Sequence, residues 1–93
     1  MEKRTGFVGI ILESRDGVDG VNHVLSEHAD LILARMGLPC RDKGISVITL
    51  VVEATTDELG TLTGRLGKIS GVSVKSALSK QVKRDGKLKA DGG

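Results

Sequence analysis

The run Ile45–Glu53 constrains the fold most strongly, because it has the composition of a β-strand that is apolar on both faces. Side chains alternate between the two faces of a strand. The two faces carry Ile45, Val47 and Val51 on one side and Ile48, Leu50 and Val52 on the other. A chain of 93 residues supplies about two helices, which cover one face of a small sheet. We therefore expect the second face to meet another copy of the chain.

Size and composition describe one small domain. Hydrophobic residues make up 39% of the sequence and charged residues 28%, which is ordinary for a globular protein. A length of 93 residues leaves no room for a second domain. Aromatic residues are scarce, with one Phe, no Tyr and no Trp. Single-stranded nucleic-acid binders and RNA-recognition sheets need aromatic platforms for base stacking, so the composition argues against both classes.

Basic residues are concentrated at the C-terminal end. Residues 80–93 contain five Lys or Arg and two Asp, whereas the rest of the chain contains nine basic and ten acidic residues. A nearly neutral domain lacks the basic stripe that grips nucleic-acid phosphates, so we expect no direct binding of nucleic acid. We expect the folded domain to occupy residues 1–80 and a basic, disordered tail to occupy residues 81–93.

The cysteine content and the first residues indicate the compartment. Cys40 is the one cysteine, so no internal disulfide can form and the chain is compatible with a reducing cytosol. The chain shows no signal-peptide pattern, and no stretch approaches the ~18 apolar residues of a membrane span. These features predict a cytoplasmic protein that makes no membrane contact.

Hydrophobic periodicity predicts elements in the order β-α-β-β-α-β. Strands are expected over 5–13, 30–38, 45–53 and 72–79, with a connection rich in helix and strand breakers over 37–44. Asp16 is the expected N-cap of the first helix, and Thr55 with Glu58 forms a capping box for the second. The apolar stripes of the two helices are Val18, Val21, Leu25 and His28, then Leu59, Leu62, Leu66 and Ile69.

The two helical stripes have identical spacing, and each helix lies between two strands, so the chain reads as two related halves. This arrangement predicts an α+β, ferredoxin-like βαββαβ sandwich, in which a four-stranded antiparallel sheet carries both helices on one face. The bare face of the sheet is the predicted interface of a homodimer or homotetramer.

Several short motifs resemble a known family. They are Ala34–Pro39, Lys43–Ile48, Thr55–Gly60 and Gly71–Ser76. In this order they resemble the iron-only hydrogenase system regulators, which in turn are similar to ACT domains and to the C-terminal domain of the nickel-responsive repressor. The resemblance implies a ferredoxin-like fold, self-association and a regulatory role connected with hydrogenase. Because the chain contains no DNA-reading motif, any control of transcription would pass through a partner.

The resemblance also suggests a ligand site, because ACT-like domains commonly bind small molecules where the first strand turns into the first helix. There, the Arg15 guanidinium can receive a carboxylate, Asp16 can accept an ammonium and Gly17 permits close backbone approach. With Val18 and Asn22 nearby, these residues form the predicted ligand-binding site for a small amino-acid-like effector. The alternative is that Asp16 only caps the helix and Arg15 is solvated.

Other functions find less support in the sequence. His23 and His28 would point about 140° apart on a helix, and Cys40 lies elsewhere in the chain, so we expect no metal site within one chain and no cofactor. Glu13 and Glu53 lie at strand ends without a nucleophile and base beside them, so we expect no enzymatic activity. The remaining alternatives are a protein–protein adaptor without a small-molecule ligand and a metal-responsive domain whose site is shared between subunits.

Overall fold

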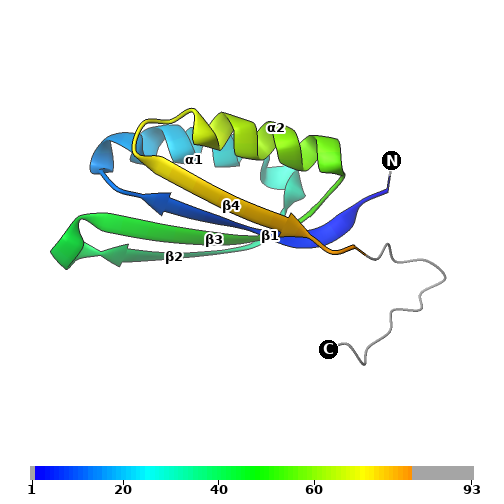
Figure 1. The fold of residues 1–93 in the computed structure, drawn as a ribbon, viewed down its shortest axis with the longest axis horizontal. Coiled ribbons are helices and arrows are strands. Elements are labelled where there is room, and N and C mark those ends of the chain that lie inside the picture. Colours follow the sequence, from blue (N-terminus) through cyan, green and yellow to red (C-terminus); the bar gives the residue numbers. More distant parts are fainter. Residues whose placement is uncertain (1, 81–93) are drawn as a thin grey trace, which may run out of the picture.

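The computed structural model describes residues 2–80 and contains a single sheet with two helices on one of its faces (Figure 1). The strands are β1 (Arg4–Leu12), β2 (Ile32–Cys40), β3 (Ile45–Ala54) and β4 (Val72–Leu78), and the helices are α1 (Val18–Glu27) and α2 (Thr56–Gly67). The strand order is β2-β3-β1-β4 and every neighbouring pair is antiparallel. The predicted βαββαβ sandwich is thereby confirmed. The predicted tail, 81–93, lies outside the described residues.

One hydrophobic layer joins the sheet to the helices. The strands contribute side chains at alternating positions, and the helices contribute theirs at helical spacing. The largest fully buried side chains in this layer are Val8, Ile10, Val21, Leu50, Val52, Leu62 and Leu66. The predicted helical stripes are confirmed at Val21, Leu25, Leu59, Leu62 and Leu66. These contacts fix the inner face of β3 and leave its other face uncovered.

The capping box predicted for α2 is present. The Thr55 hydroxyl accepts a hydrogen bond from the Glu58 backbone N–H at 3.1 Å, and the Glu58 carboxylate accepts one from the Thr55 N–H at 2.9 Å. The Lys3 ammonium lies 3.1 Å from the same carboxylate. Two N–H groups that would otherwise lack a partner at the start of α2 are therefore satisfied.

The start of α1 differs from the prediction. Asp16 is not the N-cap, because it lies inside a 3₁₀ turn, Arg15–Gly17, and the Ser14 hydroxyl accepts a hydrogen bond from the Asp16 N–H at 3.3 Å. The helix then begins at Val18 with no side-chain cap. The N-cap of the turn is thus Ser14, two residues before the predicted one, and serine caps as well as aspartate does. The neighbouring Glu13 N–H donates a hydrogen bond to the Gly71 carbonyl at 2.8 Å, which fixes the chain at this point.

The predicted break between the second and third strands also lies too early. The sequence predicted a connection from Gly37 onward, but β2 continues through Pro39 to Cys40. Proline lacks a backbone N–H and is tolerated here because β2 is an edge strand of the sheet. The pairing register of β2 shifts between Ile32 and Ala34, where a bulge leaves Leu33 exposed.

The capping box generates a stability prediction. Thr55→Ala removes the hydroxyl that accepts the Glu58 N–H, and we expect the free energy of unfolding to fall by about 1 kcal/mol in urea titrations. Thr56→Ala, which removes an exposed hydroxyl at the next residue, is the matched control and should change stability by less than about 0.5 kcal/mol. Equal losses in both variants would contradict a capping role for Thr55.

The charge of Glu58 makes the free energy of unfolding depend on pH. The hydrogen bond from the Thr55 N–H, followed by that from Lys3, lowers the pKa of Glu58 from its ordinary 4.5. A lowered pKa in the folded state stabilises the fold above the ordinary pKa, and this contribution is lost as the pH falls through the lowered value. The stability gap between wild type and Glu58→Gln should therefore close below pH 4.5.

Candidate functional site

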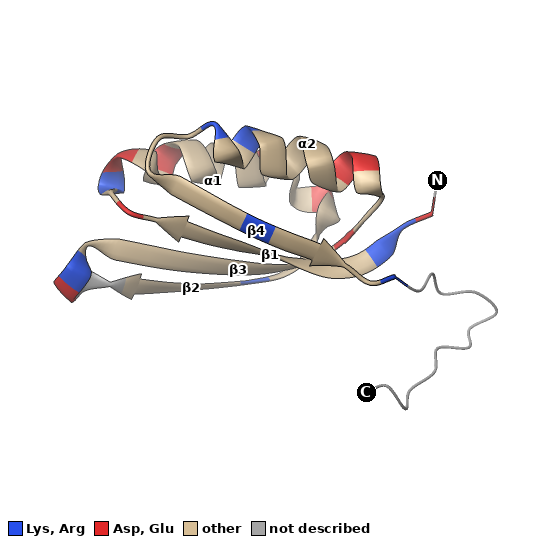
Figure 2. Cartoon of the chain, viewed as in Figure 1, with Lys and Arg blue, Asp and Glu red and all other residues tan. Residues whose placement is uncertain are grey.

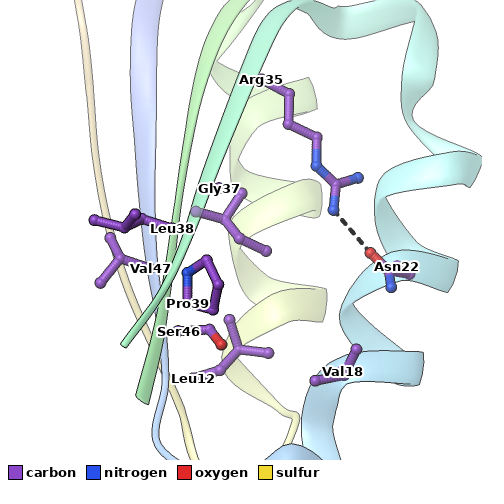
Figure 3. Close-up of a pocket in the computed structure, with 10 residues that line it drawn as sticks. Leu12, Val18, Asn22, Arg35, Gly37, Leu38, Pro39, Ser46 and Val47 are labelled. Atoms are coloured by element: carbon purple, nitrogen blue, oxygen red, sulfur yellow. Dashed lines mark hydrogen bonds between the residues drawn. The ribbon is translucent and has the colours of Figure 1, made fainter. Parts of the chain in front are cut away.

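A hollow lies between α1 and the β2–β3 hairpin (Figure 3). Its volume is about 190 Å³ and its walls are mostly apolar, with contributions from Leu12, Val18 and Ile48. The side chains of Asn22, Arg35 and Ser46 add polar groups. Small-molecule sites are typically concave and apolar with a few polar groups that fix orientation. The hollow has this composition on a small scale.

Arg35 reaches across this region from β2 to α1. It pairs in register with the buried residue Leu50, so its side chain projects on the face of the sheet that carries the helices. One terminal guanidinium nitrogen of Arg35 donates a hydrogen bond to the Asn22 side-chain oxygen at 2.9 Å, as Figure 3 shows. This bond links the edge strand to the first helix.

A second hollow of about 300 Å³ lies on the other side of the same bond. It shares Asn22 and Arg35 with the first and adds Leu25, Ser26, Ala29 and Ile32. The two hollows together form what we call the α1–β2 groove, which the Arg35–Asn22 hydrogen bond crosses. The groove exists because the helices leave β2 largely uncovered, with residues 33–39 all exposed.

The predicted ligand-binding residues fall into two groups. Val18 and Asn22 line the first hollow. Arg15 and Asp16 are exposed on the 3₁₀ turn that precedes α1, and Gly17 is buried on the side of Ile69 and Val72. An ideal Cβ on Gly17 would lie 3.1 Å from a methyl carbon of Val72, so glycine is needed for this close packing. Ligand binding by these five residues stays a prediction.

Arg35 is the feature of the groove that sequence reasoning missed. An arginine in a strand usually reaches solvent, and the bulge at Leu33 shifts the alternation so that Arg35 joins the inward-facing positions. The strand pattern before the bulge therefore assigns Arg35 to the wrong face. The sequence signal for this contact is Arg35 itself, which stands between two apolar residues in the predicted strand. The preceding helix offers it one carboxamide partner, Asn22.

The two histidines belong to a polar network that ties α1 to α2. Arg65 lies 2.6 Å from one carboxylate oxygen of Glu27 and 3.1 Å from Nε2 of His28, and His23 lies 3.2 Å from the other Glu27 oxygen. The hydrogen bond from Arg65 lowers the pKa of the Glu27 carboxyl. Among the side chains that the structure describes, no three His, Cys, Asp or Glu groups converge in a way that could hold a metal ion.

Neither helix in the described part of the chain has the length and apolar character needed to span a membrane. The strand-end carboxylates considered as catalytic candidates, Glu13 and Glu53, are both exposed. The surfaces on which binding can be proposed include the α1–β2 groove, the exposed Arg15–Val18 turn and the uncovered sheet face.

Comparison with known proteins identifies the family. The sequence profile of the TM1266-like family, described as "Iron-only hydrogenase system regulator, putative", matches residues 4–76. The chain belongs to this family. A structure of the uncharacterized protein TM1266 from Thermotoga maritima is 36% identical, superposes with a TM-score of 0.81 and covers 85% of this chain and 100% of its own. The predicted family resemblance is confirmed.

Two further solved structures share the fold. The ACT domain of GTP pyrophosphokinase from Chlorobium tepidum is 24% identical, with a TM-score of 0.70 over 81% of this chain and 99% of that domain. The C-terminal domain of the MgtC protein from Mycobacterium tuberculosis is 15% identical, with a TM-score of 0.62 over 85% and 90% of the two chains. The fold is therefore ACT-like. No curated protein matches the sequence.

Proposed function

We propose that the chain is a non-catalytic regulatory module of the iron-only hydrogenase system, which works in the cytoplasm as a homo-oligomer and responds to a small effector. The observation that carries this proposal is the uncovered sheet face. Five large hydrophobic side chains are 39–70% exposed there. They are Phe7, Ile11, Met36, Leu38 and Val51, which together we call the apolar sheet patch.

The strand register makes these side chains one continuous surface. Phe7 lies opposite Val51 between β1 and β3, and Leu38 lies opposite Val47 between β2 and β3. The middle of β1 and of β3 carries no charged residue, whereas helices and connections carry most of the charges (Figure 2). On β4 the same face presents Ser73 and Lys75. An apolar centre with a polar margin is the anatomy of a protein interface.

A second copy of the chain suits this patch best. An interface with two-fold symmetry places one patch on its own copy, so a chemically uniform apolar surface is complementary to itself. Extension of the sheet edge to edge is less suitable at β2, because a bulge and Pro39 interrupt its free hydrogen-bonding groups. We therefore propose that two sheets pack face to face through the patch.

The effector site in this proposal is the predicted turn, Arg15–Val18 with Asn22. Arg15 and Asp16 are exposed and of opposite charge, which suits a zwitterionic amino acid. The Glu13 N–H that precedes the turn donates to Gly71 beside β4, so a ligand here would bear on the sheet as well as on α1. A ligand changes assembly only through its different affinity for the two association states.

The oligomer is tested by a substitution within the apolar sheet patch. Phe7→Lys places a charge on an apolar interface, and we expect the molar mass from light scattering to fall to that of a single 9.8 kDa chain, with the circular dichroism of the fold retained. Thr61→Lys adds the same charge on the helix side, at an exposed position of α2, and should leave the molar mass unchanged.

A wild-type molar mass of one chain at all concentrations would contradict the proposed self-association. A molar mass that falls for Thr61→Lys and not for Phe7→Lys would move the interface to the helices.

The effector is tested by thermal unfolding with a reporter dye, because the chain lacks Trp and Tyr. At 100 times its dissociation constant, an effector adds about 2.7 kcal/mol of apparent stability, which is readily seen in a domain of this size. We expect an amino acid to raise the midpoint for the wild type and to lose its effect in the double variant Arg15→Ala, Asp16→Asn. An undiminished shift in the double variant would remove the turn as the site, and no shift with any small molecule would favour the adaptor alternative.

A further inference from the structure

We infer that the α1–β2 groove binds a small monocarboxylate with an apolar body, and that Arg35 holds its carboxylate. The inference goes beyond the effector proposed above, because it assigns a ligand of a different class to a site anchored by Arg35 and not by the Arg15–Val18 turn. Figure 3 shows the Arg35 guanidinium directed across the groove toward Asn22, with Val18 and Leu12 below it.

The charge of Arg35 is not compensated within the described chain. A guanidinium has five N–H donors in a planar fork, and here one of them donates to the neutral Asn22 carboxamide. No carboxylate of residues 2–80 lies within ion-pair distance of Arg35. Planar pairs of N–H donors match a carboxylate, which they bind through two parallel hydrogen bonds.

The residues that line the groove indicate which kind of anion would bind there. The described residues that line the two hollows include no Asp or Glu, so the ammonium of an amino acid would find no counter-charge among them. Among the described residues that line the groove, Arg35 is the one cationic side chain, which suits a single negative charge better than a polyphosphate. Leu12, Val18 and Ile48 offer an apolar wall for an aliphatic body.

The first hollow sets the size of the apolar body, because Leu12, Val18 and Ile48 lie there and its space holds only a few carbon atoms. The first hollow, at about 190 Å³, is below the range of about 300–1,000 Å³ that is typical for drug-sized ligands. A carboxylate that takes over the Arg35 fork displaces the Asn22 oxygen, and the two hollows then join into one trough. The bound ligand would tie β2 to α1 in place of the Arg35–Asn22 bond.

The test compares a charged ligand with its neutral isostere on the full chain. Nuclear magnetic resonance titration of the labelled protein with 4-methylpentanoate should give saturable shifts at the backbone amides of Val18, Asn22 and Arg35. The neutral 4-methylpentanamide should bind at least about tenfold more weakly, because it cannot form the charge-assisted pair. Arg35→Gln should weaken carboxylate binding by a similar factor. Lys68→Gln removes a charge from an exposed position at the end of α2 and should leave binding unchanged.

Three results would overturn the inference. They are equal binding of the amide and the carboxylate by the wild type, binding that depends on Arg15 and not on Arg35, and absence of saturable binding. If Arg35→Gln does not fold, the comparison of the two ligands with the wild type still decides. Molar mass measured on the same samples tests the proposed self-association independently, so that failure of the groove and failure of the oligomer can be told apart. A zwitterionic amino acid that stabilises the chain through Arg15 and Asp16 would support the turn site, and the comparison of carboxylate with amide, together with Arg35→Gln, decides the groove separately.

Discussion

Strand β3 carries hydrophobic side chains on both faces, and α1 and α2 cover only one of them. Ile48, Leu50 and Val52 are buried against the helices, whereas Val51 on the opposite face is 39% exposed and lies beside Phe7. Burial of apolar area is the main favourable term in folding and association. Covering the exposed apolar face of β3 would therefore lower the free energy of the protein further. The apolar sheet patch follows from this one-sided cover, and the proposed oligomer with face-to-face packing is inferred from the patch.

The groove has the same cause, because the two helices do not cover the whole sheet. Two helices of ten and twelve residues pack on one face of the sheet, with α2 mainly beside β4, and leave the edge strand β2 exposed along residues 33–39. Arg35 and Asn22 bridge part of this opening with one hydrogen bond, and hollows remain on both sides of it. A ligand in the groove and a partner on the patch would occupy opposite faces of β2 and β3. Those two strands are therefore the natural route for coupling between effector and assembly.

The sequence predicts the elements that depend on local chemistry or on strict periodicity. The Thr55–Glu58 capping box and the leucine stripe of α2 are readable because their spacing is fixed by the helix itself. Predictions fail where tertiary context decides. Asp16 does not cap α1 because it lies inside the 3₁₀ turn that Ser14 caps, and Pro39 is tolerated in β2 because that strand is at the edge of the sheet. The bulge at Leu33 hid the face of Arg35, so the sequence pointed to the turn of α1 and missed the groove.

Contacts between copies can be observed directly in a mixed sample of isotope-labelled and unlabelled chains. The decisive measurement is an isotope-filtered nuclear Overhauser experiment on the methyl groups of Met36, Leu38 and Val51. If two sheets pack through the apolar sheet patch, these methyl groups show cross-peaks to protons of the unlabelled copy, including the ring protons of Phe7. Absence of such cross-peaks in a sample shown to be oligomeric, or cross-peaks confined to the helices, would contradict the account.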